Sequence, residues 1–268
     1  MCEPDPERAR PEIARNIFER VQVSWSQAGA MRRPLGWGAS VAVVLVIVAG
    51  YVVYRSFRPS SVRLARLRQY WNDPQAHPEW MLRSGEPCGE APFVAPTDGY
   101  IGFLWGDVMR ATHRHQGLDI FGPTGPNGLG ETPVVAAYGG YLTRRPTWRS
   151  AVIIRIPQDP LQPGRQIWTY YTHMADPEGS SFVDPAFPPG TSEVFVAAGR
   201  LLGYQGNYSA DPYNPTGMHL HFSIVLDDGA GGFRNELEIQ NTVDPTPYFG
   251  FDVNAATIGD RIALCSSG

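Results

Sequence analysis

The sequence contains no lysine, and all 22 of its basic residues are arginine. A Walker-type phosphate-binding loop and a lysine Schiff base both need the lysine amine, so both are excluded. The formal net charge is -4 and the pI is about 5.9. Nucleic-acid-binding domains usually carry a clear basic patch, so this composition indicates no nucleic-acid partner.

Cysteine is also scarce, with only Cys2, Cys88 and Cys265 in 268 residues. These positions are too far apart for a zinc knuckle or a C-x-x-C redox pair. Cys88 and Cys265 lie near the two ends of the predicted C-terminal domain and could form a disulfide in an oxidising compartment. Two free thiols remain the alternative, because a disulfide depends on a Cα separation that the sequence does not give.

One long apolar run is present at residues 35–54, with 20 residues and no charge. At about 1.5 Å per residue, a helix of this length crosses a hydrocarbon core of roughly 30 Å. Arginines on both sides and apolar residues on every face favour a transmembrane helix over a buried core helix. No small-x-small site follows Tyr54, which favours an uncleaved single span over a signal peptide.

The sequence indicates less directly on which side of the membrane each end of this span lies. More arginines follow the run than precede it, and the positive-inside rule alone would place the C-terminal half in the cytoplasm. The rule weakens for long translocated domains, and the chemistry described next needs an external substrate. We therefore predict a single-pass membrane protein, with its C-terminal domain outside the cytoplasm.

The span divides the chain into segments. We expect a cytoplasmic segment at 1–34, the transmembrane helix at 35–54, a stalk and linker at 55–91, a folded domain at 92–250 and a tail at 251–268. Serine and apolar spacing predicts a short stalk helix at 60–71, and residues 72–92 are rich in proline, glycine and polar residues.

Within the domain, short apolar runs separated by glycine and proline predict strands, and no long amphipathic helix lies between them. The fold class is therefore mainly β, an antiparallel sandwich or barrel. The predicted strands are 134–138, 151–156, 168–173, 194–197 and 219–225.

The six histidines carry the main functional signal. In the HLH motif, His219 and His221 should share one face of a strand, because strand side chains alternate with a period of two. Leu220 and Phe222 should then face the core behind them. Two imidazoles on one rigid face are suited to a metal site.

The HQGLD motif adds a nitrogen ligand and an oxygen ligand, His115 and Asp119. Zinc accepts both ligand types, and catalytic zinc sites usually leave the fourth position to water. Zinc can lower the pKa of such a water to about 7. Each motif is weak by itself, and the combination carries the specificity.

With these motifs in place, the chain resembles the lysostaphin/LytM family of peptidoglycan peptidases, over roughly residues 92–250. The matching segments, in chain order, are APTDGYI at 95–101, HQGLDI at 115–120, TPVVAAYGGYL at 132–142, TYYTHM at 169–174, GRLLGYQGN at 199–207 and GMHLHFSI at 217–224. Met218 departs from the proline that is common there, and the loops after Asp119 and before Met218 are long, which puts substrate preference in doubt.

The resemblance implies a zinc ion held by His115, Asp119 and His221. It also implies that His173 and His219 are catalytic residues that do not bind the metal. One of them would accept a proton from water and the other would stabilise the oxyanion. The sequence does not assign these two roles.

The function implied is that of a membrane-anchored zinc metalloendopeptidase that hydrolyses peptide bonds of peptidoglycan stems or cross-bridges. One alternative is a catalytically inactive LytM-like module that binds division, sporulation or hydrolase partners. Another is a zinc peptidase that acts on a protein. Of the other histidines, we expect His113 to line the substrate-binding groove beside the metal site and His77 to be a solvated surface residue. A further hypothesis is that the stalk folds back and places His77 or Asn72 on the zinc, which would keep the enzyme inactive.

Overall fold

The computed structural model describes residues 37–110 and 112–265, without the side chains of 37–40, 54–61 and 110. The predicted cytoplasmic segment 1–34 lies outside the described residues. The chain divides into two compact units, Met1–Gly50 and Tyr51–Gly268. The second unit contains all six histidines, Asp119, Cys88 and Cys265.

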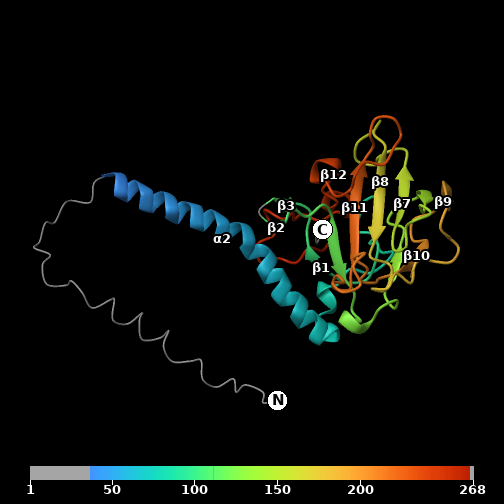
Figure 1. Cartoon of the computed structure of the whole chain (residues 1–268), viewed down its shortest axis with the longest axis horizontal. Coiled ribbons are helices and arrows are strands. Elements are labelled where there is room, and N and C mark those ends of the chain that lie inside the picture. The colour runs from blue at the N-terminus through green and yellow to red at the C-terminus, as the bar shows by residue number, and fades with distance from the viewer. Residues whose placement is uncertain (1–36, 111, 266–268) are drawn as a thin grey trace, which may run out of the picture. The chain divides into compact units, whose positions relative to one another are not determined.

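The longest element is helix α2, Trp37–Asn72 (Figure 1). The short helix predicted at 60–71 is the C-terminal part of this longer one. Side chains of the apolar run are exposed from Val41 to Val53. Among the residues open to description, no helix is long and apolar enough to cross a membrane. Part of the predicted span lies outside those residues, so the anchor stays a prediction.

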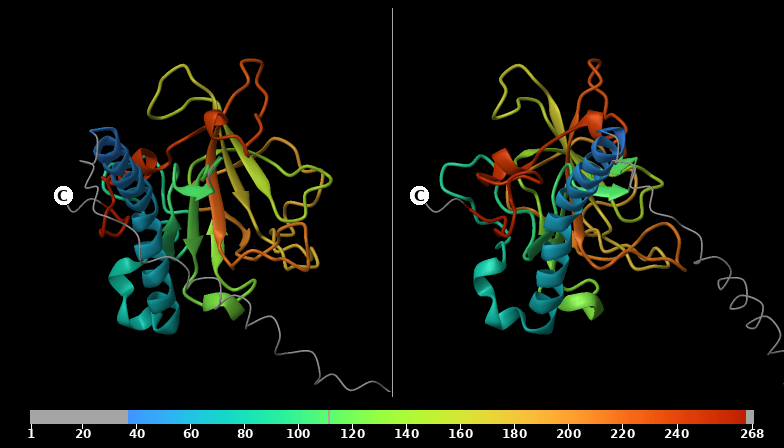
Figure 2. Two further views of the ribbon diagram at one scale, coloured as in Figure 1. Left: turned by 60° about the vertical axis from the view of Figure 1, so that its left-hand side comes forward. Right: turned by 90° about the vertical axis from the view of Figure 1, so that its left-hand side faces the viewer.

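An antiparallel sheet of eight strands forms the centre of the second unit. Its strands fan out with the twist expected of such a sheet (Figure 2). The mainly β, antiparallel class is therefore confirmed. In sheet order the strands are β1 (Tyr100–Phe103), β4 (Leu118–Phe121), β11 (Leu220–Leu226), β8 (Ile167–Thr172), β7 (Val152–Ile156), β6 (Gly140–Thr143) and β9 (Val194–Val196), and β12 (Thr242–Val243) also pairs with β11.

Two smaller sheets and five short 3-10 helices complete the described fold. One small sheet pairs β5 (Pro133–Val135) with β10 (Leu201–Tyr204), and the other pairs β2 (Val108–Arg110) with β3 (His113–Arg114). The 3-10 helices are η1 (Pro74–Ala76), η2 (Pro78–Trp80), η3 (Gly125–Asn127), η4 (Ile239–Asn241) and η5 (Thr246–Phe249).

Both faces of the central strands are covered. The main core joins alternate residues of the large sheet, such as Leu220 and Phe222, to the β5–β10 ribbon and to the C-terminal segment. A smaller cluster on the other face contains Ile153, Trp168 and Val225. Burial of both faces explains why β7, with the sequence VIIRI, is a nearly continuous apolar run. The five predicted strands all coincide with observed strands within a few residues.

The predicted linker and tail both contain residues that pack against the domain. Leu82 is buried and bridges Gly99, although it lies among prolines and polar residues. Phe251 and Ile258 are buried in the main core, in the segment expected to be a tail. These irregular segments are held on the domain by single apolar side chains, which lie between turn-forming residues and pack into the core.

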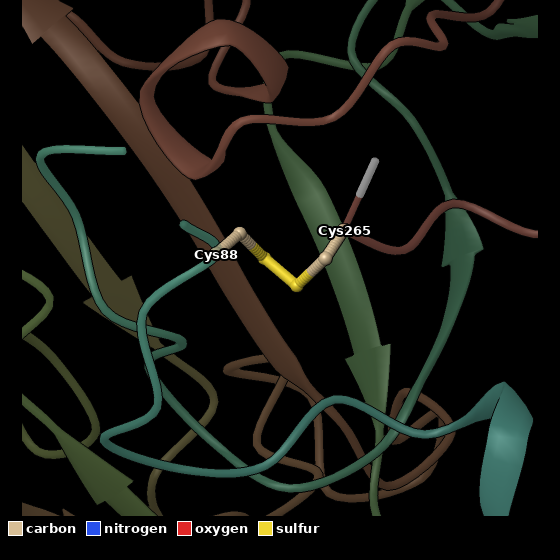
Figure 3. Close-up of a disulfide and its surroundings, with 2 residues drawn as sticks. All are labelled: Cys88 and Cys265. Atoms are coloured by element: carbon tan, nitrogen blue, oxygen red, sulfur yellow. A yellow bond between two sulfur atoms is a disulfide. The ribbon is translucent and has the colours of Figure 1, made fainter. Parts of the chain in front are cut away.

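A disulfide between Cys88 and Cys265 joins the two segments, with a Cα separation of 5.1 Å (Figure 3). Of the two states that the sequence left open, the structure therefore has the bridge. It closes a loop with a sequence separation of 177 residues.

Replacing both cysteines, Cys88→Ser with Cys265→Ser, should lower the free energy of unfolding by about 2–5 kcal/mol. The loss of a cross-link that closes so long a loop raises the entropy of the unfolded chain. Urea unfolding of both proteins would measure the difference. A reducing agent should destabilise the wild-type protein to a similar extent and leave the double variant unchanged. Equal midpoints for both proteins without a reducing agent would contradict the prediction.

Candidate metal centre

Asp119 and His221 lie on neighbouring strands, β4 and β11, and are directly paired in the sheet register. Paired residues project their side chains from the same face. Their ligand atoms, Asp119 Oδ1 and His221 Nδ1, are 2.8 Å apart. The register of the sheet therefore brings together two residues that are 102 positions apart in the sequence.

His115 reaches the same carboxylate oxygen from the segment before β4. Its Nε2 lies 2.9 Å from Asp119 Oδ1 and 3.1 Å from His221 Nδ1. Gly117 lets the segment approach β11 closely, because a Cβ at that position would lie 2.1 Å from the carbonyl oxygen of Phe222. The glycine between the two ligands is thus required by this close approach.

The three ligand atoms fit one metal ion. Zinc bonds to histidine nitrogen and carboxylate oxygen are about 2.0–2.1 Å, so neighbouring corners of a zinc tetrahedron are roughly 3.3 Å apart. The observed separations of 2.8–3.1 Å form a slightly contracted face of such a tetrahedron. Among the described residues, His115, Asp119 and His221 are the group able to hold a metal ion.

Hydrogen bonding sets the tautomer of His115. Its Nδ1 is 3.1 Å from the carbonyl oxygen of Leu104, and a carbonyl can only accept a hydrogen bond. Nδ1 therefore carries the proton, and in the neutral ring Nε2 presents a lone pair to the carboxylate of Asp119. Two acceptors facing each other repel unless a proton or a metal cation lies between them. A backbone carbonyl on the far ring nitrogen is typical of metal-binding histidines.

His221 is oriented by a neighbour that sequence analysis did not identify. Its Nε2 lies 2.8 Å from the hydroxyl oxygen of Ser223, two residues further along β11. The period of two in a strand places Ser223 on the face of His221, so the signal was present in the HLHFS sequence. The Tyr170 ring lies 6.5 Å from the His221 ring and borders the same face.

The charges in the group favour a cation. Burial alone would raise the pKa of Asp119, but the charges of His115 and His219 and their hydrogen bonds hold it well below its usual range. Burial likewise opposes protonation of His115, yet the charge and hydrogen bond of Asp119 outweigh it and raise its pKa. Burial lowers the pKa of His221. The carboxylate is therefore ionised, and it favours a positive charge beside it, either a proton on His115 or a metal cation.

Zinc affinity should fall as the pH is lowered through the raised pKa of His115, because proton and metal compete for Nε2. Loss should begin above pH 6.5, since the pKa lies above the ordinary value, and should proceed by about tenfold per pH unit for one displaced proton. Chelator competition at a series of pH values would measure it. His113→Asn, which changes an exposed histidine outside the group, should leave the profile unchanged. A flat profile in the wild-type protein would contradict this competition.

His219 lies immediately before β11 and contacts the same carboxylate from the side. Its Nε2 is 3.4 Å from Asp119 Oδ1, and its Nδ1 is 2.6 Å from the carbonyl oxygen of Gly217. The carbonyl again assigns the proton to Nδ1. Phe121 stacks on the ring with centroids 4.9 Å apart. The predicted sharing of one face by His219 and His221 is thus observed, with Leu220 and Phe222 buried behind them.

His173 follows β8 and completes the cluster of imidazoles. Its ring centroid lies 4.6 Å from that of His219, and its Nδ1 is 2.6 Å from the carbonyl oxygen of Tyr208. Burial, followed by the charges of His219 and His221, lowers the pKa of His173 to about 3. The ring is therefore neutral at physiological pH, with its lone pair on Nε2.

The backbone of His173 is in the left-handed region, with φ +72. Side-chain-bearing residues rarely adopt this conformation, and such strain is concentrated at functional sites. The turn it makes directs the ring to the group formed by His219 and His221.

The other two histidines take no part in the group. His113 is exposed on β3. His77 stacks on Trp80 with ring centroids 3.8 Å apart and has Nδ1 3.7 Å from the carboxylate of Glu79. Neither belongs to the possible metal group of the described residues. The structure thus gives His77 local partners in Trp80 and Glu79, outside the metal group.

No family model matches the sequence, and no curated protein matches it. Among solved structures, it is similar to the catalytic domain of a point mutant of the prophage-encoded M23 protein EnpA from Enterococcus faecalis. The identity is 22%, with 55% of this chain and 90% of that chain covered, and the TM-score is 0.28. The function proposed next is therefore inferred from the sequence motifs and the geometry of the site.

Proposed function

We propose that this chain is a zinc metalloendopeptidase that hydrolyses peptide bonds of peptidoglycan. One observation carries the proposal: the ligand atoms of His115, Asp119 and His221 converge within 3.1 Å of one another, beside two further imidazoles. Three protein ligands leave one position of a tetrahedral zinc ion for water or substrate, as in catalytic sites.

When bound, zinc would supply a Lewis acid that polarises a carbonyl and makes water acidic at neutral pH. The chain itself supplies the groups that move protons. His173 and His219 both hold the Nδ1 proton on a backbone carbonyl, so each accepts a new proton at Nε2. That proton then makes Nε2 a donor, either to a leaving amine or to an oxyanion. Either ring can therefore act first as the acceptor of a proton and then, once protonated at Nε2, as the donor.

The proposed location is the outer face of a bacterial cell membrane. The exposed apolar side chains from Val41 to Val53 support an anchor in the first part of α2. The disulfide between Cys88 and Cys265 supports an extracytoplasmic domain, because such bonds persist in oxidising compartments. An anchor of this kind would restrict cutting to peptidoglycan close to the membrane.

The proposal is tested by digesting purified peptidoglycan with the full chain and identifying the products by mass spectrometry. Soluble muropeptides with new amino termini should appear, and a chelator should abolish them. The Asp119→Asn variant is the matched control and should release none. Stoichiometric zinc without any cleavage of peptidoglycan would instead favour the binding module, or a peptidase with a protein substrate. A wild-type protein that binds no zinc would contradict the proposal.

A further inference from the structure

We infer that Arg63 of helix α2 and Asp107 are positioning residues for the metal ligand His115. The inference rests on the proposed function of the site. Arg63 is only 1% exposed, although it lies in the segment predicted to be a stalk helix. Arginine is almost never fully buried unless it is paired. Its partner, the carboxylate of Asp107, is also buried, at 5% exposure.

Helix α2 packs against the domain through one face. Arg63, Leu67 and Tyr70 follow the helical spacing i, i+4, i+7 and are all buried. Leu67 and Tyr70 form a cluster with Tyr100 and Phe121, which lie on the edge strand β1 and on its neighbour β4. The C-terminal end of the helix is therefore part of the folded domain, next to the strand that carries Asp119.

The contacts of Arg63 lead to the metal ligand in three steps. Its guanidinium pairs with Asp107 Oδ2, and its Nε donates to the carbonyl oxygen of Gly102 at 3.1 Å. Asp107 Oδ2 also accepts a hydrogen bond from the backbone N–H of Leu104 at 2.7 Å. The carbonyl oxygen of Leu104 then accepts from His115 Nδ1 at 3.1 Å. The Leu104 peptide segment is thus held from both sides.

Backbone hydrogen bonds close the same turn onto His115. The N–H of His115 donates to the carbonyl oxygen of Asp107 at 2.9 Å, and the N–H of Gly106 donates to the carbonyl oxygen of His115 at 2.8 Å. Asp107 therefore contacts His115 through the backbone and controls its ring through Leu104. Partners that orient a ligand histidine typically change metal affinity by about 10–100-fold when they are lost.

A second contact of α2 reaches the other side of the site. Trp71 Nε1 donates to the carbonyl oxygen of Gly122 at 3.1 Å, and its ring packs edge-on against Phe121 at 5.4 Å. Phe121 in turn stacks on His219. The helix therefore supports a metal ligand through Arg63 and a proposed catalytic residue through Trp71. Packing alone does not require a buried ion pair, since apolar side chains of similar volume often stabilise a core as well.

The test compares four proteins as full chains purified in mild detergent: wild type, Arg63→Gln, Asp107→Asn and Leu67→Ala. Arg63→Gln removes the charge, and Asp107→Asn keeps an oxygen for the N–H of Leu104 but loses the ion pair. Leu67→Ala is the matched control, because it loosens the same helix face without touching Asp107. Zinc dissociation constants are measured by chelator competition, unfolding by urea, and ligand geometry by the absorption spectrum of the cobalt-substituted protein.

We expect Arg63→Gln and Asp107→Asn each to bind zinc about 10–100-fold more weakly than wild type and to show an altered cobalt spectrum. Leu67→Ala should lose stability but keep its zinc affinity within about twofold and its spectrum unchanged. If Arg63→Gln does not fold, Asp107→Asn alone decides. Wild-type zinc affinity in Arg63→Gln and Asp107→Asn would overturn the inference and leave the proposed function standing. The same holds if Leu67→Ala is destabilised to the same extent as these variants and loses as much zinc affinity. Absence of zinc from the wild-type protein would overturn both.

Discussion

Asp119→Asn should leave the purified protein without stoichiometric zinc and without peptidase activity. The carboxylate oxygen lies within 2.9 Å of the ligand nitrogens of both His115 and His221, and the amide oxygen that replaces it carries no charge. We expect zinc affinity to fall by more than about 100-fold, beyond the effect of losing an outer partner. Metal content by mass spectrometry and chelator competition would measure it.

The control for this substitution is His113→Ala, which removes an exposed imidazole near His115 in sequence. It should retain one zinc per chain and the wild-type rate. Retention of zinc and activity by Asp119→Asn would refute the assignment of this group as the metal site. Loss of zinc by His113→Ala would mean that the ligand set is incomplete.

Removing either of the two other imidazoles should separate metal binding from turnover. His219→Ala and His173→Ala should each keep zinc and reduce kcat by about 10²–10⁴-fold, the usual contribution of a positioned proton-transfer group. His219 Nε2 is 3.4 Å from the carboxylate of Asp119 but does not belong to the group of three ligand atoms. Its removal therefore leaves the ligand set intact. Zinc content and the initial rate of muropeptide release would be measured on the same samples.

The matched control is His77→Ala, whose imidazole stacks on Trp80 in the N-terminal segment of the domain. Its rate per bound zinc should equal that of the wild type. Loss of zinc from His219→Ala would reassign that residue as a ligand. An undiminished rate in both His219→Ala and His173→Ala would point to proton transfer by water or by another group.

Much of the site could be predicted because strand periodicity is local. The HLH motif fixed two side chains on one face, and the structure brings both to the same carboxylate. Strands β7, β8 and β11 are rich in β-branched and aromatic residues and were predicted at nearly their observed bounds. Strand β4 was not predicted, since it has only four residues and one of them is Asp119. Its identity as a strand depends on pairing with β1 and β11, which local sequence does not reveal.

The role of α2 could not be predicted, because it depends on contacts with residues far away in the sequence. Arg63 occupies a position where a charged residue normally indicates the solvated face of a helix. Only its partner, 44 residues further along the chain, makes that position a buried one. Similarly, Leu82 and Ile258 are isolated apolar residues among turn formers, and their burial follows from neighbours brought close by the fold. Contacts between distant segments account for most of what the sequence left undetermined.

The bond between Cys88 and Cys265 has a practical consequence for any shortened version of this protein. A fragment that begins at Phe93 keeps Cys265 but lacks its partner. Its unpaired thiol would be available to cross-link two molecules during secretion or storage in air. Such material would migrate as a covalent dimer on a non-reducing gel, and activity measured on it would describe an artificial assembly in place of the native chain.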